Sequence, residues 1–378
     1  MSELMNAKHG NEGFRRNLLA NVSAIALLGY ACGMQPASAD DSDRPVVWVE
    51  LGGQFERLDS AQTIFAPPFF AVASSQIVAP MVGAQHQPSF SVGEEGKIAF
   101  QPEGSDWVVS ASLRYGRSNG SKHLHYETEH KTQQTVFGRL ATETGRPLFR
   151  FGDGQTESDE SHLVLDFQAG KDVGLGLFGA HGTSIISAGV RFVQFTSRAD
   201  VNLHARPLYR SGPFIKTPQF SLHGAYFQNN TAVLQARRST EAVGPMLSWD
   251  ASVLVAGNGT HRSLTFDWGI NAAILFGRQR ARIHQQTTGA SLYDYPGGYY
   301  PSKQNGYTSK PADRNRARNV TIPNIGGFAG ISFKYADAKL ALGYRADLFF
   351  NAMDGGIDTR KSENVGFYGP FAAISVGF

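Results

Sequence analysis

Two neighbouring groups of residues are of the types that enzymes use for nucleophilic catalysis. Ser118-Asn119-Gly120 ends an alternating segment, and His123, His125 and His130 follow it. A serine acts as a nucleophile only with a general base held beside it. The position two residues before the serine is Gly116, which cannot serve as that base. His123, His125 and His130 belong to the polar loop expected after this segment, and the sequence pattern places none of them beside the serine, so we expect no enzyme activity.

Two further patterns could bind a cofactor or a metal. Gly174–Gly179 matches GxGxxG, but a dinucleotide-binding loop joins a strand to a helix, and here the pattern lies between two expected strands. Asp153, Gln155, Glu157 and Asp159 alternate and offer oxygens that Ca²⁺ accepts, yet the spacing of an EF-hand loop is absent. We therefore predict a glycine-rich turn and a solvated acidic loop, with no cofactor and no metal.

The composition excludes several classes of protein. The chain has 378 residues, and its single cysteine argues against a disulfide framework and a cysteine-based metal site. The net charge of +3, without a concentrated basic tract, gives no support for nucleic-acid binding. After the N-terminus, no apolar run reaches the roughly 18 residues of a transmembrane helix.

The N-terminus has the three parts of a secretion signal. The basic pair Arg15-Arg16 precedes an apolar stretch from Leu18 to Cys32, and Ala37-Ser38-Ala39 is a small-residue cleavage site. We predict that residues 1–39 are removed and that residues 40–378 form a single domain.

The segment from Ser263 to Arg278 separates into two chemistries by parity. Its even positions are apolar from Leu264 to Phe276, and its odd positions are small or polar, with Leu275 as the only large apolar intruder. Because side chains of a strand alternate between faces, this pattern predicts a strand with one apolar face. The strand is long enough to cross a bilayer, which needs about 9–11 tilted residues.

Nine other segments repeat this alternation. These nine are 47–55, 92–101, 107–116, 162–170, 186–192, 247–255, 329–335, 339–348 and a last segment that ends at Phe378. Ser263–Arg278 is the tenth. The connections between them are long and short in turn, as in transmembrane barrels with short periplasmic turns and long external loops.

The segments therefore predict an all-β fold, a transmembrane up-and-down antiparallel barrel of ten strands in the bacterial outer membrane. In lipid, every backbone polar group must be paired internally, so only helices and closed barrels span. An even strand number places both termini in the periplasm and every long loop outside. Twelve strands is the alternative, because Arg198–Glu241 is long enough to contain two more.

The end of the chain resembles the C-terminal signal of bacterial outer-membrane barrels. Ile374, Val376 and the terminal Phe378 alternate there. The resemblance implies that the barrel-assembly machinery reads this strand during biogenesis. His162–Gly170 with Gly189–Phe192, and the stretch from Arg237-Arg238 to Val243-Gly244-Pro245, are similar to the pore-forming major outer membrane proteins of Gram-negative bacteria. This likeness implies a channel for small solutes.

The polar parity of the strands places charges of both signs inside the barrel. The expected lumen-lining residues are Glu50, Lys97, Arg114, Asp166, Arg191, Asp250, Asp267, Lys334, Lys339, Arg345 and Asp347. Such charges can line a wet pore, or they can pair across a narrow lumen and plug it. A barrel of about eight strands is just filled by side chains, whereas about 16–18 strands leave an aqueous channel.

Three functional hypotheses follow. The first is a passive, porin-like pore for small solutes, and the family resemblance favours it. The second is a structural or adhesive surface barrel with a plugged lumen, and the third is an outer-membrane esterase. The partners expected in each case are outer-membrane lipid and the assembly machinery. The sequence carries no signal for an oligomeric state.

Overall fold

The computed structural model describes the strands of the molecule and several of their connections. The described residues are 46–60, 90–130, 134–136, 139–141, 148–173, 182–216, 221–257, 262–294, 303–308, 312–355 and 362–378. The expected signal segment, residues 1–39, and the GxGxxG pattern at Gly174–Gly179 lie outside this set. No helix among the described residues is long and apolar enough to cross a membrane.

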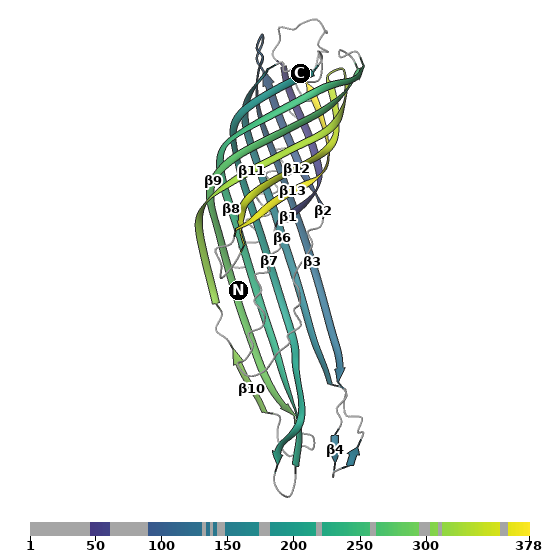
Figure 1. Cartoon of the computed structure of the whole chain (residues 1–378), viewed down its shortest axis with the longest axis vertical. Coiled ribbons are helices and arrows are strands. Elements are labelled where there is room, and N and C mark those ends of the chain that lie inside the picture. The colour runs from purple at the N-terminus through teal and green to yellow at the C-terminus, as the bar shows by residue number, and fades with distance from the viewer. Residues whose placement is uncertain are drawn as a thin grey trace. The chain divides into compact units, whose positions relative to one another are not determined.

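Ten antiparallel strands close into an up-and-down barrel (Figure 1). Each strand pairs with the next in the chain, and β13 pairs with β1 to close the sheet. The barrel strands are β1 (Val46–Ser60), β2 (Phe90–Gln101), β3 (Trp107–His130), β6 (Leu148–Asp172), β7 (Gly182–Lys216), β8 (Ser221–Gly257), β9 (Arg262–Asp294), β11 (Ala312–Tyr335), β12 (Ala338–Asp354) and β13 (Ser362–Gly377). The predicted fold class and strand number are confirmed.

Three short strands lie outside this barrel pairing. β4 (Gln134–Val136) and β5 (Arg139–Ala141) form a hairpin of their own between β3 and β6. β10 (Lys303–Thr308) pairs with residues 288–293 of β9.

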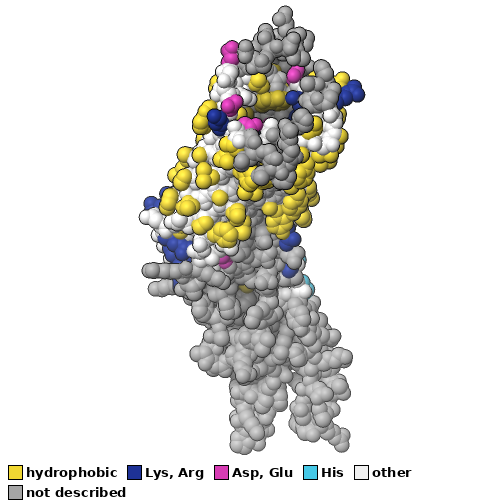
Figure 2. All heavy atoms as spheres, turned by 45° about the horizontal axis from the view of Figure 1, so that its top comes forward, with side chains coloured by type: hydrophobic (Ala, Val, Ile, Leu, Met, Phe, Trp, Pro, Cys, Tyr) yellow, Lys and Arg dark blue, Asp and Glu magenta, His cyan; other side chains and the backbone are white. Residues whose placement is uncertain are grey.

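The two faces of each barrel strand differ as the alternation predicts. On β9, Ile270, Ile274 and Phe276 point outward and each is more than half exposed, whereas Ala273 and Leu275 between them are buried. Outward apolar residues occur on every barrel strand and gather over its outer surface (Figure 2). We call this surface the apolar band.

The strands extend far beyond the apolar band, which corrects the expected loops. The polar segments 117–160, 198–241 and 279–321 are for the most part paired strand. Residues beyond the apolar band have no apolar face, so the alternation that reveals the strands disappears there while the backbone pairing continues. Residues 198–241 prolong β7 and β8, so the twelve-strand alternative is wrong.

Among the described residues, six strands have these long extensions. Beyond Glu94–Tyr115 the described part of β2 no longer pairs with β3, and β12 pairs with β11 only as far as Asn324–Phe349. The extensions of β3, β6, β7, β8, β9 and β11 therefore continue as an open sheet on the side of the long connections.

Candidate functional site in the barrel lumen

A layer of apolar side chains crosses the lumen. Leu275 and Ile322, on neighbouring strands, are completely buried, and so are Phe349 and Phe367 on the two strands that follow. The layer contains Leu58, Val164, Val193, Phe195, Ala242, Met246, Ala273, Leu275, Ile322, Phe349, Ala352, Met353, Val365 and Phe367. These residues come from β1, β6, β7, β8, β9, β11, β12 and β13, so the layer joins opposite walls of the barrel.

Aromatic rings form the middle of this layer. Phe195 of β7 meets Phe349 of β12 edge to face, with ring centroids 4.9 Å apart. Phe349 also stacks on Phe367 of β13 at 5.7 Å. Since β7 is not a neighbour of β12, these contacts cross the interior of the barrel.

A cluster of four buried charges adjoins the apolar layer. Arg191 forms two hydrogen bonds with Asp166, from Nε at 2.7 Å and from Nη2 at 2.8 Å. Arg114 of β3 reaches Asp347 of β12, with Nη1 2.5 Å from Oδ2. The guanidinium of Arg114 also lies over the ring of Phe367 at 5.7 Å. All four charged side chains are less than a tenth exposed. The ion pairs and hydrogen bonds therefore stabilise these charges in place of water.

Arg191 is also bonded to two side-chain amides, one on β9 and one on β11. Its Nη1 donates to Oδ1 of Asn271 at 2.7 Å and to Oδ1 of Asn324. Asn324 in turn donates to the carbonyl of Leu348 at 3.1 Å. Arg114, Asp166, Arg191 and Asp347, which the alternation places inward, therefore lie together. Asn271 and Asn324 also belong to this cluster, although they were not among the expected lumen residues because they carry no charge.

The other expected lumen charges form smaller groups. Arg345 is bonded to Glu95 and lies 4.8 Å from the ring of Phe371. Asp267 accepts hydrogen bonds from three hydroxyl groups and is 2.6 Å from Nζ of Lys339.

The remaining expected charges are spread along the strands. Glu50 accepts a hydrogen bond from Ser375 at 2.9 Å and lies opposite Lys97 in the β1–β2 ladder. Lys334 lies 5.6 Å from the ring of Trp48, and Asp250 lies against Gly269.

The end of the β12–β13 hairpin turns into the lumen. Residues 350–352 of β12 stand opposite the single residue Asn364 of β13, so the ladder contains a bulge. Asn351 has a positive φ of 57°, which asparagine tolerates better than most residues. The four consecutive residues Ala352 to Gly355 are all buried, although a strand in a barrel wall would bury only alternate ones. Residues 352–355 therefore lie inside the barrel, where Ala352 and Met353 complete the apolar layer. We call these residues, together with Ser362 and Glu363, the hairpin end.

Arginines from other strands hold this hairpin end. Arg238 of β8 donates to Glu363 and to the carbonyl of Asp354, both at 3.1 Å. Arg316 of β11 is bonded to the Asp354 carboxylate, with Nε 2.8 Å from Oδ2. Arg318 donates to Ser362 at 2.9 Å. Arg238 and Arg316 lie in segments that were expected to be polar loops. Their contacts with the hairpin end follow from the register of the extended strands, which the sequence pattern does not reveal.

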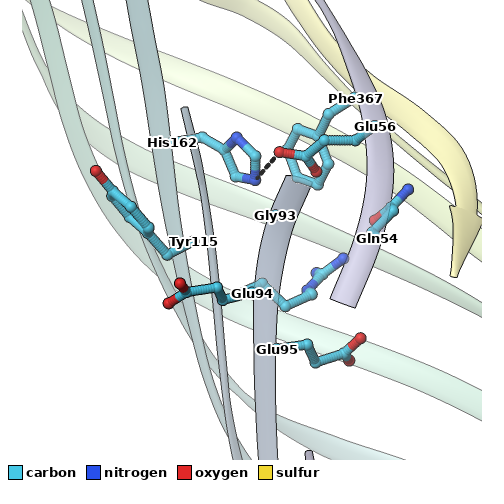
Figure 3. Close-up of a pocket in the computed structure, with 9 residues that line it drawn as sticks. Gln54, Glu56, Gly93, Glu94, Glu95, Tyr115, His162 and Phe367 are labelled. Atoms are coloured by element: carbon cyan, nitrogen blue, oxygen red, sulfur yellow. Dashed lines mark ion pairs between the residues drawn. The ribbon is translucent and has the colours of Figure 1, made fainter. Parts of the chain in front are cut away.

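A small recess beside the layer contains a buried acid and a buried imidazole (Figure 3). Oε1 of Glu56 lies 3.6 Å from Nε2 of His162, and both side chains are almost completely buried. His162 stacks on Phe367 at 4.0 Å, and its Nδ1 has no hydrogen-bond partner among the described residues. The first strand was expected to end at Phe55, so Glu56 was not among the expected lumen residues. The signal for a longer strand is Leu58, which is buried on the same face two residues later.

Two glycines make room for the Glu56 carboxylate. A Cβ at Gly93 would lie 2.9 Å from its Cδ, and a Cβ at Gly116 would overlap its Oε1 and Cε1 of His162. Gly93 is on β2 and Gly116 on β3, the two strands between Glu56 and His162. The glycines therefore allow an acid on β1 to reach an imidazole on β6.

The residues considered for catalysis and metal binding belong to the extended sheet. Ser118 is buried, and His123 and His125 both contact Asp153, at 3.0 and 3.2 Å. These hydrogen bonds hold the pKa of Asp153 below its ordinary value, and the one with His123 has the larger effect. Within the described ranges, no group of three or more His, Cys, Asp or Glu side chains could hold a metal ion.

The residues of the expected assembly signal are exposed. Ile374 is 58% exposed on the outward face of β13, where Val376 is partly exposed, and Phe378 is 48% exposed.

No protein-family model matches the chain, and no curated protein matches it in sequence. Two solved structures are weakly similar to it. One is described as a TodX deltaS2S3 mutant monoaromatic hydrocarbon channel, with 10% sequence identity and a TM-score of 0.21, over 90% of this chain and 92% of that one. The other is a TodX deltaS2 mutant of the same channel, with 9% identity and a TM-score of 0.20 over the same shares. This chain is a ten-strand antiparallel β-barrel with a weak structural similarity to an outer-membrane channel.

Proposed function

We propose that this chain is an integral β-barrel of the outer membrane with a closed lumen, a structural or adhesive surface barrel rather than a pore. The apolar layer in the lumen is the observation that carries the proposal. A solute passing through would have to displace Phe195, Phe349 and Phe367, which are packed as tightly as a protein core.

The outer surface supports the membrane location. Outward residues such as Ile270, Ile274 and Phe276 are exposed on a barrel whose interior is already filled by its own side chains. An exposed apolar surface of this extent marks contact with lipid or another protein, and its presence on all ten strands favours lipid.

The paired charges support the closed lumen. In a water-filled pore, Arg114, Arg191 and Asp347 would be solvated, whereas here each is buried in ion pairs. The passive pore, which the family resemblance of the sequence favours, is therefore the second candidate. The inward hairpin end favours it, because the contacts of Arg238 and Arg316 are side-chain contacts that could break without unfolding the wall.

Conductance in planar lipid bilayers separates these candidates. Folded wild-type protein, verified by its heat-modifiable electrophoretic mobility, should give no steady conductance steps. Steady, ohmic conductance from wild-type protein would contradict the closed lumen and support the pore.

A further inference from the structure

The outward face of β7, β8 and β9 has a second feature directly beyond the apolar band. Phe192, Val243 and Phe276 form one row across these strands, and they are the last large apolar residues on that face before the arginines begin. The rows that follow carry five exposed arginines: Arg198, Arg237, Arg278, Arg280 and Arg282. We call these five the arginine patch. Figure 2 shows Lys and Arg side chains at the border of the hydrophobic surface.

Three members of the patch stand side by side. Arg198 is opposite Arg237 in the β7–β8 ladder, and Arg237 is opposite Arg282 in the β8–β9 ladder. Like charges directly opposite each other destabilise a sheet unless something neutralises them. Arg278 and Arg280 precede Arg282 on the same face of β9 and add to this charge.

The protein itself neutralises little of this charge. Arg198 is paired with Asp200 at 2.7 Å, and Arg282 donates to the amide oxygen of Asn315 at 3.2 Å. Within the described part of the chain, Arg237, Arg278 and Arg280 have no ion pair.

One further carboxylate, Glu241, shares this face and stands opposite Arg278 in the ladder. The patch with Asp200 and Glu241 keeps an excess of three positive charges. Its guanidinium groups are therefore available to an anion from outside the chain.

The patch lies at the level of lipid headgroups. Arg278 is one row beyond Phe276 and Arg282 is three rows beyond it. At about 3.3 Å per residue and a tilt of about 45°, these rows stand roughly 5 and 14 Å above the edge of the hydrocarbon. Arginine side chains are long enough to reach down from the upper rows to the same groups.

We propose that the arginine patch binds the phosphate groups of a phosphorylated glycolipid in the outer leaflet. A guanidinium binds phosphate with two parallel hydrogen bonds, and several of them side by side match a headgroup that carries more than one phosphate. The acyl chains of the same molecule would lie on Phe276 and Val243 below the patch. This inference rests on the proposed membrane location and adds a specific lipid partner to it.

Binding of lipid A to folded protein in neutral detergent micelles tests the inference. Wild-type protein should bind lipid A, and enzymatically dephosphorylated lipid A should bind about a hundredfold more weakly, since each arginine near an anionic headgroup contributes about fivefold. The R237Q/R278Q/R280Q variant removes the arginines that have no described ion pair and should lose about a hundredfold in affinity by the same reasoning.

Single variants provide the matched control. R280Q should lose about fivefold in affinity. R262Q removes an exposed arginine from the same face of β9 at the opposite end of the apolar band and should leave the affinity unchanged. Equal losses in R280Q and R262Q would overturn the inference, because they would show an effect of net charge alone. Inorganic pyrophosphate that competes at the same concentration as lipid A would identify a site for free anions and overturn the lipid as partner.

Insertion into phosphatidylcholine liposomes distinguishes the two proposals. Protein that inserts there but does not prefer lipid A over its dephosphorylated form refutes the lipid site and leaves the membrane barrel standing. Protein that does not insert at all refutes the membrane location, and with it the lipid site.

Discussion

Glu56 and His162 meet inside the barrel although two strands separate them in the sheet. Their side chains approach to 3.6 Å because glycines on β2 and β3 leave the space between them open. Gly116→Ala should therefore push the carboxylate away from the imidazole and cost about 1–3 kcal/mol, as overpacking of a filled core does. Urea unfolding in phosphatidylcholine liposomes measures this loss.

Gly96→Ala is the control for that substitution. Gly96 lies on β2 as well, but its Cβ would meet only Cδ2 of Leu51, at an ordinary 3.8 Å. It should change the free energy of unfolding little. In a Glu56→Ala background, Gly116→Ala should cost less than in the wild type, because the overlapping carboxylate is gone. Additive effects would contradict the steric explanation.

Arg114→Ala should be strongly destabilising. It leaves Asp347 and Asp166 buried with Arg191 as the single arginine near both, and removing one partner of a buried pair typically costs about 3–5 kcal/mol. The comparison is Arg198→Ala, which removes an exposed ion pair and should cost about 0–1 kcal/mol. Similar unfolding free energies for the two variants would show that the central charges are solvated.

Release of the hairpin end should open the lumen. The double variant R238A/R316A removes contacts to Glu363 and Asp354 while leaving the barrel wall intact. We expect intermittent conductance steps in planar bilayers where the wild type is silent. R117A, which removes an ion pair with Asp159 outside the lumen, should remain silent. A silent double variant that is correctly folded would mean that the apolar layer closes the lumen without the hairpin end.

Ile270→Arg tests the position of the membrane. Ile270 is at the middle of the outward apolar residues of β9, so an arginine there should cost about 2–4 kcal/mol in a bilayer. Gln155→Arg, on the exposed face of β6 beyond the band, should stay within about 0.5 kcal/mol. Equal effects of the two substitutions on unfolding in liposomes would place the apolar band outside lipid.

The outer end of the β3–β6 pair should loosen in acid. Because His123 and His125 lower the pKa of Asp153 in the folded protein, this group stabilises the fold above its ordinary pKa of 3.8, and that stabilisation is lost as the pH falls through the lowered value. The protection of residues 120–126 against hydrogen exchange, relative to the intrinsic exchange rate at each pH, should therefore fall below about pH 4. Asp153→Asn should remove this acid-dependent step, and an unchanged profile in that variant would assign it to another group.

The fold was predictable because an exposed apolar outer face imposes a pattern on the sequence. Alternating apolar residues such as Leu264 to Phe276 reveal a strand wherever one face meets hydrocarbon. Past the band both faces are polar, so Arg117–His130 and Leu148–Glu160 read as loops although they pair along their whole length. Pairing of backbone groups, which leaves no trace in side-chain type, decides those boundaries.

The contacts inside the lumen were only partly predictable. Parity placed Arg114, Asp166, Arg191 and Asp347 inside, but their contacts depend on the stagger between distant strands. Leu275 was the visible exception to a polar inner face, and it is one of the residues that fill the lumen. The hairpin end could not be inferred, because a bulge changes the facing of residues without changing their composition.

The bulge at residues 350–352 also makes the length of β12 critical. Substitutions near Asn351 would alter single contacts, but an insertion or deletion of one residue there would exchange the faces on which Met353 and Asp354 point. The apolar side chain and the carboxylate that Arg316 holds would then both be misplaced. The number of residues between Phe349 and Met353 is therefore a stricter requirement of this barrel than the identity of Asn351.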